Sequence, residues 1–168
     1  LKMVGAEADR LGLECYVIGG YVRDLFLHRE STDIDVVVVG SGISLAEAVA
    51  KKLGKGAHLS VFKTYGTAQV KRGDLELEFV GARRESYTRD SRNPIVEDGT
   101  LQEDQDRRDF TINAMAYNET EGLVDLFGGK EDLENGILRC VGEAKDRFDE
   151  DALRILRALR FSAQLNFE

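Results

Sequence analysis

Residues 15–39, CYVIGGYVRDLFLHRESTDIDVVVV, carry the strongest fold signal in the chain. The first four residues read as a short apolar strand, the pair Gly19-Gly20 as a tight turn, and residues 21–27 as a helix. The β-branched run 34–39 is apolar on both faces except at its start, which is typical of a central strand in a buried sheet. Strand, glycine turn, helix and central strand together predict an α/β fold.

The flanking sequence extends this unit in both directions. Residues 2–14 have the apolar spacing of a helix that ends at Gly12. Ser44 and Glu47 have the spacing of a capping box at the start of a helix over 44–53. Three strands are expected next, the last two joined as a hairpin, near 59–62, 67–72 and 75–82.

A long polar stretch follows these strands. Residues 84–106 contain the only proline, Pro94, and show no periodicity, so we expect a long loop of the kind that is functional or disordered. Its acidic residues read as a solvated run: Glu97, Asp98, Glu103, Asp104 and Asp106.

The C-terminal part alternates helices with short strands. A helix is predicted over 107–117, followed by a strand over 123–127, a helical turn over 130–134 and a strand over 137–141. The region 143–164 is helical. We expect its apolar ridge to be buried, namely Leu153, Leu156, Leu159 and Ala163.

Composition limits the classes of protein that the chain can represent. Its 168 residues suit one domain or one domain with a small addition, and 42% apolar with 32% charged residues is typical of a soluble globular fold. No apolar run approaches the roughly 18 residues of a membrane helix. The net charge of −8 argues against a broad basic surface for nucleic acid. Two cysteines, Cys15 and Cys140, are too few for a disulfide framework and favour the cytoplasm.

An acidic pair opens the predicted central strand. Asp33 and Asp35 are two residues apart, so their side chains project from the same face. Two carboxylates that face one point repel each other unless a cation lies between them, and paired Mg²⁺ ions roughly 3.5–4 Å apart suit phosphoryl transfer. Glu78, on a later strand, is a candidate third ligand. The alternative is a strand entry with solvated carboxylates.

Glycine and arginine residues suggest a phosphate site beside this pair. The backbone of Gly19-Gly20 can approach a phosphate, and Arg23 in the following turn would answer a triphosphate or, alternatively, pair with an acid such as Asp24. A second polar group opens the next predicted helix: Arg107, Arg108, Asp109 and Asn113. Its last two members lie among apolar neighbours, so we expect them to bind either a loop backbone or a ribose and phosphate.

A polar ridge repeats every three residues near the C-terminus: Asp151, Arg154, Arg157 and Arg160. It is either a helix start followed by solvated arginines or a reader of nucleobase edges. A carboxylate accepts from an exocyclic amine while a guanidinium donates to a ring nitrogen or carbonyl, a pattern that cytosine and adenine match and uracil and guanine do not. An Asp–Arg pair here would select C and A.

Five motifs occur in order along the chain: GGxVRD at 19–24, DxD at 33–35, RRDxxxNA at 107–114, DxFGG at 125–129 and EDxxRxxRxxRF at 150–161. Together they resemble the successive motifs of the class II tRNA nucleotidyltransferase family, which includes CCA-adding enzymes and bacterial poly(A) polymerases. The resemblance implies a nucleotidyltransferase head of the polymerase-β type, an α/β fold with a mixed sheet flanked by helices, over residues 1–138. The start of an all-helical, nucleobase-reading neck would follow over 139–168.

The resemblance also implies a role for each motif. Asp33 and Asp35 would hold the catalytic Mg²⁺, and Glu78 would be the third catalytic carboxylate. The implied triphosphate, ribose and phosphate contacts are Gly19, Gly20, Arg23, Arg107, Arg108, Asp109 and Asn113. The implied base readers are Asp151 and Arg154, supported by Arg157 and Arg160.

The implied activity is transfer of CMP and AMP from CTP and ATP to a tRNA 3′ hydroxyl, with release of pyrophosphate. A poly(A) polymerase and a non-catalytic nucleotide-binding module are the alternatives. Family members continue into further helical regions that hold the tRNA. We therefore expect the RNA 3′ end to be bound mainly by regions absent from these 168 residues, which would also account for the missing basic surface.

Overall fold

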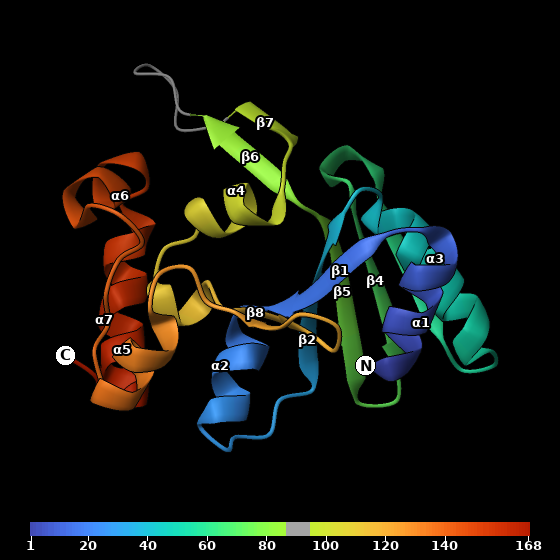
Figure 1. Ribbon diagram of the computed structural model, residues 1–168, viewed down its shortest axis with the longest axis horizontal. Coiled ribbons are helices and arrows are strands. Elements are labelled where there is room, and N and C mark those ends of the chain that lie inside the picture. The colour runs from blue at the N-terminus through green and yellow to red at the C-terminus, as the bar shows by residue number, and fades with distance from the viewer. Residues whose placement is uncertain (87–94) are drawn as a thin grey trace.

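The computed structural model describes residues 1–86 and 95–168, which form a seven-stranded mixed sheet, a separate two-stranded sheet and surrounding helices (Figure 1). The N-terminal elements are α1 (Lys2–Leu11), β1 (Glu14–Ile18), α2 (Gly20–Phe26), β2 (Asp33–Val39), α3 (Gly42–Leu53), β3 (His58–Phe62), η1 (Lys63–Tyr65), β4 (Thr67–Arg72) and β5 (Leu75–Gly81). The later elements are β6 (Arg83–Ser86), β7 (Ile95–Asp98), α4 (Leu101–Asp106), η2 (Thr111–Asn113), β8 (Ala116–Asn118), β9 (Gly122–Val124), α5 (Gly129–Asn135), α6 (Ala144–Glu150) and α7 (Leu153–Leu165). Within these described parts, no helix combines the length and apolar character needed to cross a lipid bilayer.

The large sheet has the strand order β3-β4-β5-β2-β1-β8-β9, which confirms β2 as a central strand. Strands β2 and β5 are parallel, and the other neighbouring pairs are antiparallel. The predicted hairpin is also confirmed, since Arg72 pairs with Leu75 across Gly73-Asp74. The α/β fold predicted from residues 15–39 is therefore present.

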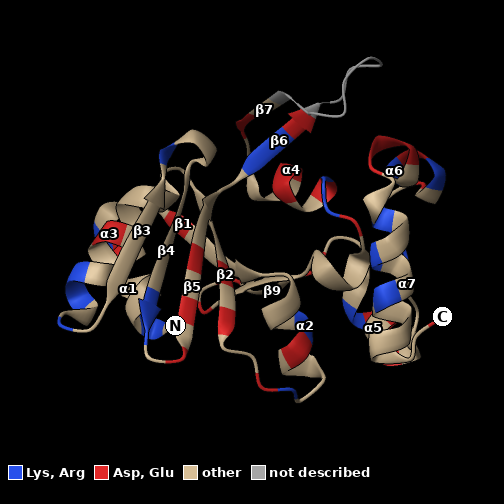
Figure 2. Ribbon diagram, turned by 180° about the vertical axis from the view of Figure 1, so that it is seen from behind, with Lys and Arg blue, Asp and Glu red and all other residues tan. Residues whose placement is uncertain are grey.

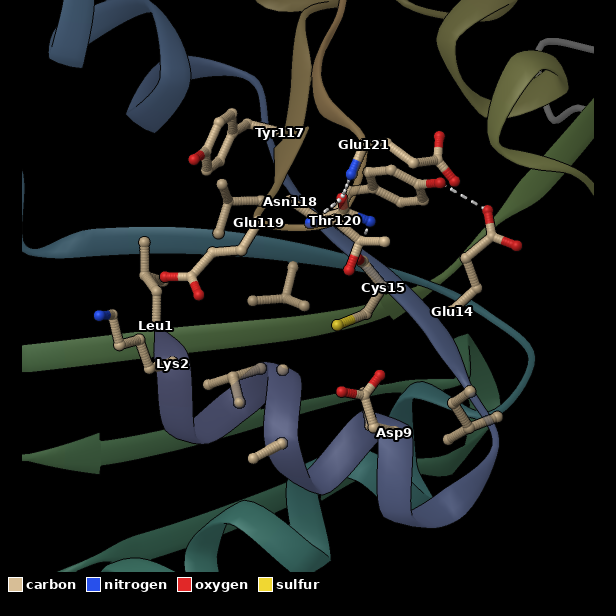
Figure 3. Close-up of a pocket in the computed structure, with 18 of the residues that line it drawn as sticks. Leu1, Lys2, Asp9, Glu14, Cys15, Tyr117, Asn118, Glu119, Thr120 and Glu121 are labelled. Carbon is tan, nitrogen blue, oxygen red and sulfur yellow. Dashed lines mark hydrogen bonds between the residues drawn. The ribbon is translucent and has the colours of Figure 1, made fainter.

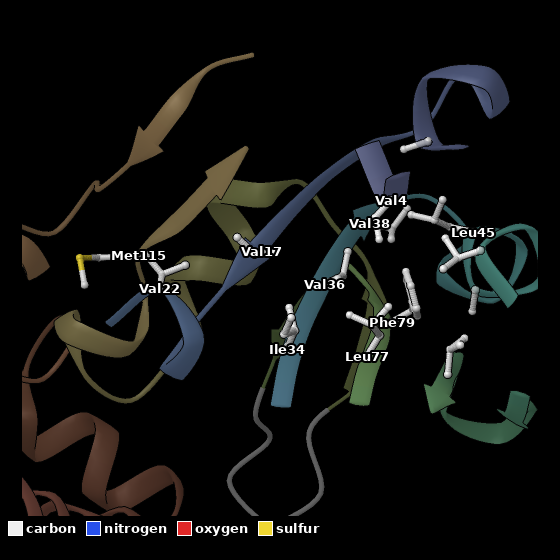
Figure 4. Packing of buried hydrophobic residues seen from close by; sticks show 14 of the residues in the cluster. Val4, Val17, Val22, Ile34, Val36, Val38, Leu45, Leu77, Phe79 and Met115 are labelled. Carbon is white, nitrogen blue, oxygen red and sulfur yellow. The ribbon is translucent and has the colours of Figure 1, made fainter. Parts of the chain in front are cut away.

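The two faces of β2 have different surroundings. Ile34, Val36 and Val38 face the main core, where they pack with Leu77 and Phe79 of β5 beneath α1 and α3 (Figure 4). Alternation along the strand places the aspartates on the opposite face, where α4 covers only the end nearest Val37 and Val39. The sheet therefore buries one face and leaves part of the other accessible.

The N-terminus of α3 differs from the prediction. The cap is Ser41, whose Oγ accepts a hydrogen bond from the backbone N–H of Ser44 at 3.1 Å, and the helix begins at Gly42. The predicted capping box of Ser44 and Glu47 is therefore wrong. Both serines have the residue type of a cap, and Ser41 takes the position because it comes directly after the turn that ends β2.

The long loop predicted over 84–106 is also wrong in its described parts. These contain β6, β7 and α4, and α4 begins with a capping box between Thr100 and Glu103. Pro94 and the rest of residues 87–94 lie outside the described residues. Periodicity did not predict α4 because its buried residues are the polar Asp104 and Gln105.

The helix predicted over 107–117 is replaced by extended backbone, the short 3-10 helix η2 and β8. Phe110 is extended, with φ −123° and ψ 148°, and Ala116 pairs with Ile18 of β1. The strand predicted over 137–141 is reduced to a single bridge between Phe110 and Cys140. Pairing with distant strands determines the conformation of both segments, so their local apolar content does not predict it.

The C-terminal helical region is confirmed as α6 and α7, but its predicted buried ridge is wrong. Leu153, Leu156 and Leu159 are 64%, 63% and 64% exposed, and Ala163 is exposed as well. Helix α7 instead buries Arg154, Phe161 and Leu165. Nη2 of Arg154 donates to the carbonyl of Arg107 at 3.2 Å, so this arginine is buried together with two apolar residues of the helix.

Candidate active site

The acidic residues form two adjacent rows on the accessible face of the sheet. Parallel pairing places Asp33 opposite Glu76 and Asp35 opposite Glu78. Figure 2 shows the resulting acidic segments of β2 and β5 side by side. Glu76 is occupied by neighbours on β4, because Gln69 donates to it and the Nζ of Lys71 lies 3.1 Å from its Oε2. The structure thus places the three predicted catalytic carboxylates, Asp33, Asp35 and Glu78, on the same face of two adjacent strands.

Repulsion and desolvation act on these carboxylates together. Desolvation raises the pKa of Asp35, the charge of Arg108 lowers it, and the charge of Asp33 raises it further. Desolvation, Asp35 and Glu76 likewise raise the pKa of Glu78, against an opposing effect of Arg83. The ionised row is unfavourable by itself, so a cation would stabilise it.

The donor set fits a hard divalent cation. Among the described residues, no group of three or more His, Cys, Asp or Glu side chains is arranged to enclose a metal ion. Mg²⁺ is commonly held by one or two carboxylates together with substrate phosphates and water, so Asp33 and Asp35 have the chemistry required.

The predicted glycine turn lies against this row. Gly19 has φ 75° and ψ −134°, a conformation that L side chains rarely adopt. A Cβ built on Gly19 would lie 3.4 Å from Nη1 of Arg108 and 3.9 Å from Oδ2 of Asp35. The backbone of Gly19 therefore lies close to both the guanidinium of Arg108 and the carboxylate of Asp35, a candidate metal ligand. Gly20 follows at the first position of α2, where its Cβ would meet the guanidinium of Arg23 at 3.5 Å.

Arg23 is bound within the fold. It is 6% exposed, its Nε donates to Asp24 at 2.8 Å, and its Nη1 donates to Oδ1 of Asn113 at 2.9 Å. Its guanidinium also stacks on the ring of Phe161, 5.4 Å from the centroid. The pairing with Asp24, considered as the alternative, is therefore present, and a triphosphate contact by Arg23 stays a prediction.

Asp109 links the segment before η2 to α7. Its Oδ1 accepts from the N–H of Phe110 at 2.8 Å, and its Oδ2 accepts from Nε of Arg157 at 2.6 Å. Asp109 and Asn113 are not on one α-helix as predicted, because the backbone between them is extended and then forms η2. Burial of both is confirmed, with protein groups as their partners here.

The predicted base readers lie at the junction of α6 and α7. Asp151 ends α6 and its Oδ1 accepts from the N–H of Leu153 at 2.9 Å. Nη1 of Arg154 donates to Glu150 at 2.7 Å, and its Nη2 donates to the carbonyl of Arg107 at 3.2 Å. A role in base reading stays a prediction for this pair.

The ring of Phe161 contacts several arginine side chains of the site. The guanidinium of Arg160 lies 4.8 Å from the ring centroid of Phe161, and that of Arg157 lies at 5.4 Å. Phe161 also packs edge-on against Phe110, with centroids 5.9 Å apart. The sequence gives Phe161 only as the last letter of a motif, whereas in the structure its ring is one of several contacts between α7 and the rest of the fold.

Residues 125–129, DLFGG, have a structural role. The carboxylate of Asp125 accepts from the N–H groups of Gly129 and Lys130 at 2.8 and 2.9 Å, at the start of α5. A Cβ on Gly129 would lie 2.3 Å from the carbonyl oxygen of Thr111. Only glycine lets α5 approach η2 this closely, and η2 in turn positions Asn113.

A separate pocket of about 580 Å³ lies on the opposite side of the sheet, between α1 and the turn that joins β8 to β9 (Figure 3). Val17 and Val36 line it, and the predicted site residues do not. Cys15 lies on its wall, and desolvation together with Asp9 and Glu14 raises the pKa of this thiol to about 11. The thiol is therefore neutral at physiological pH and is a poor nucleophile.

The mixed sheet, its flanking helices and the acidic row on β2 define a nucleotidyltransferase head of the polymerase-β type. Residues 15–139 match the family model of the poly A polymerase head domain, and the chain belongs to this family. The resemblance to class II tRNA nucleotidyltransferases is thereby confirmed. Nucleotidyltransferases generally use a divalent metal ion.

Comparison with known proteins gives the same result. The chain is 48% identical over 160 residues to the A-adding tRNA nucleotidyltransferase of Aquifex aeolicus, covering 93% of this chain and 19% of that protein. It is 40% identical over 163 residues to the CCA-adding enzyme of Lactobacillus delbrueckii subsp. bulgaricus, covering 96% and 40%. A tRNA nucleotidyltransferase complexed with a primer tRNA and an incoming ATP analog has a TM-score of 0.84 and 44% identity, covering 98% of this chain and 45% of that one. The chain thus spans less than half the length of these relatives.

Proposed function

We propose that the protein transfers CMP and AMP from CTP and ATP to the 3′ hydroxyl of tRNA, adding CCA and releasing pyrophosphate. The observation that carries this proposal is the row of Asp33, Asp35 and Glu78 beside the Gly19-Gly20 turn and Arg108. The names of its relatives, which include CCA-adding and A-adding enzymes, support the same reaction class.

Each group has a distinct role in the proposed reaction. Asp33 and Asp35 would hold Mg²⁺, which when bound neutralises phosphate charge and lowers the pKa of the attacking hydroxyl. The backbone of Gly19-Gly20 and the guanidinium of Arg108 bind the phosphates, and most of the rate gain comes from this positioning and charge. Glu78 adds negative charge beside Asp35 and strengthens cation binding.

Of the two arginines considered for phosphate contact, the geometry favours Arg108. Its Nη1 lies beside Gly19, whereas Nη1 of Arg107 donates to Glu85 at 3.3 Å. Asp109 and Asn113 are proposed to bind ribose after exchanging their present arginine partners, Arg157 and Arg23.

Base selection is proposed to fall to the α6–α7 junction. Asp151 and Arg154 would read the exocyclic amine and ring nitrogen of C or A. The guanidinium groups of Arg157 and Arg160 lie over the ring of Phe161 and would hold this ring against Phe110, which keeps α7 in place. Residues 1–138 are proposed as the head and 139–168 as the start of the neck, and the family match, which ends at 139, supports this boundary.

The location and RNA partner follow from the same proposal. Both cysteines are free thiols, which supports a reducing cytoplasm. The tRNA 3′ end is proposed to be held mainly by regions outside these 168 residues, because the chain itself carries a net charge of −8.

The experiment uses labelled CTP and ATP with three RNAs: a tRNA that ends before CCA, the same tRNA ending in CC, and an unrelated RNA. Addition of both nucleotides to the first tRNA supports CCA addition. Addition of AMP only to the tRNA ending in CC would instead assign A addition, the activity named for the Aquifex aeolicus relative. Repeated AMP addition to any RNA would assign a poly(A) polymerase.

A variant separates catalysis from simple nucleotide binding. Asp33→Ala should abolish addition and weaken the Mg²⁺ dependence of ATP binding, because it removes one of the two proposed metal ligands. Unchanged ATP binding with unchanged Mg²⁺ dependence would refute the metal site, and a wild-type protein that binds ATP but adds neither nucleotide would be a non-catalytic binding module.

A further inference from the structure

A completely buried carboxylate lies behind the candidate active site. Asp104 of α4 is 0% exposed. Its Oδ1 accepts from the backbone N–H of Arg83 at 3.2 Å and from Nε and Nη2 of Arg107 at 3.1 and 3.0 Å. Its Oδ2 accepts from Nε and Nη2 of Arg108 at 3.2 and 3.0 Å. One carboxylate therefore holds two guanidinium groups, one on each oxygen, and fixes both to the start of β6.

The two guanidinium groups have different surroundings. Arg107 has a second acidic partner, because its Nη1 donates to Glu85 at 3.3 Å. Arg108 extends toward Gly19, where a Cβ would contact its Nη1 at 3.4 Å. The charge of Arg108 also lowers the pKa of Asp35, so this guanidinium interacts electrostatically with the acidic row. Arg108 is consequently the arginine that faces the proposed phosphate site.

Arginine binds phosphate through a rigid planar fork, so the direction of its plane decides whether the contact forms. A buried carboxylate that holds the Nε and Nη2 edge sets this plane before any ligand arrives. We propose that Asp104 is a positioning residue that holds Arg108 with its Nη1 directed at the phosphates of the incoming nucleoside triphosphate. This inference rests on the proposed function and identifies the group on which its phosphate contact depends.

The test compares two variants of the full natural chain. Asp104→Asn keeps the size of the side chain but replaces one acceptor oxygen with a donor. Asp106→Asn removes the same charge from the same helix and is the matched control. We expect Asp104→Asn to lower kcat/KM for ATP and CTP by about 10- to 100-fold, the usual cost of misplacing a site group by about 1 Å. Affinity for ATP should fall while affinity for adenosine is unchanged, since only ATP has phosphates for Arg108 to bind. Asp106→Asn should behave as wild type.

A double-mutant cycle separates positioning from general stabilisation. If Asp104 acts through Arg108, Asp104→Asn should change kcat/KM by less than about twofold in an Arg108→Gln background. A full additional loss in that background would overturn the proposal. Equal losses of ATP and adenosine affinity in Asp104→Asn would also overturn it, because they indicate a general structural effect.

If Asp104→Asn does not fold, Arg108→Lys decides the question. Lysine keeps the charge but lacks the edge that Asp104 holds, so kcat/KM should fall as far as in Arg108→Gln. Near wild-type activity of Arg108→Lys would refute the positioning role. A wild-type protein that neither binds ATP nor adds a nucleotide would refute the proposed function itself, whereas an active wild type with an equally active Asp104→Asn would refute only the role of Asp104.

Discussion

Replacing Gly19 with alanine tests the turn that joins β1 to the candidate active site. Its φ of 75° and ψ of −134° should cost an L residue about 1–3 kcal/mol. The new Cβ would lie 3.4 Å from Nη1 of Arg108, 3.6 Å from the carbonyl oxygen of Asn113 and 3.9 Å from Oδ2 of Asp35. These are close to ordinary van der Waals distances, so backbone strain accounts for most of the loss. For a chain of this length, each kcal/mol lowers Tm by about 2–4 °C, which gives a total of roughly 2–12 °C.

The measurement is thermal and urea unfolding followed by circular dichroism, with Gly5→Ala as the matched control. Gly5 lies inside α1, and its Cβ would meet nothing within 4 Å, so the same chemical change should stabilise the protein by about 0.5–1 kcal/mol. Opposite signs for the two variants are expected. If Gly19→Ala melts at or above the wild-type temperature, the strain argument is wrong. The alanine methyl should also weaken ATP binding, because it occupies space between Arg108 and Asp35.

Three further outcomes are expected. Gly129→Ala should destabilise the protein by at least about 1–3 kcal/mol in urea unfolding, because its Cβ overlaps the carbonyl of Thr111, and wild-type stability would disprove that contact. Asp109→Asn should cost about 1–3 kcal/mol in the same assay through loss of the ion pair with Arg157, and an Arg157→Gln background should remove most of this effect. Asp35→Asn should stabilise the unliganded protein, because the folded-state pKa of Asp35 is raised and its ionisation therefore opposes folding. That gain should grow as pH rises from the ordinary carboxyl range through the folded-state pKa, and a gain that shrinks with rising pH in urea titrations would contradict the assignment.

Much of the site can be located from local sequence. Alternation along a strand places Asp33 and Asp35 on one face whatever the rest of the fold does, because successive side chains project to opposite sides. A glycine pair between an apolar strand and a helix marks Gly19 as the turn, since only glycine adopts its backbone angles without strain. Asp104 also has a local signal, because it lies three and four residues before two arginines, although an acidic run of this kind predicts solvated side chains.

Other features depend on segments that are distant in the chain. Arg23 donates a hydrogen bond to Asn113, which lies 90 residues away in the chain. The local sequence around Arg23 does not predict which distant acceptor it will bind. Helix α7 buries Arg154, because the carbonyl of Arg107 beneath it accepts a hydrogen bond from this side chain, and it leaves three leucines exposed that hydrophobic spacing alone predicts to be buried.

The sequence by itself determined the α/β class, the central strand, its acidic pair and the glycine turn, because side-chain alternation and backbone sterics act within a few residues. Only the tertiary structure decided that Glu78 stands level with Asp35, and that Asp104 is buried between two arginines. Strand register and burial are set by contacts between distant segments, whose free energies depend on the whole fold.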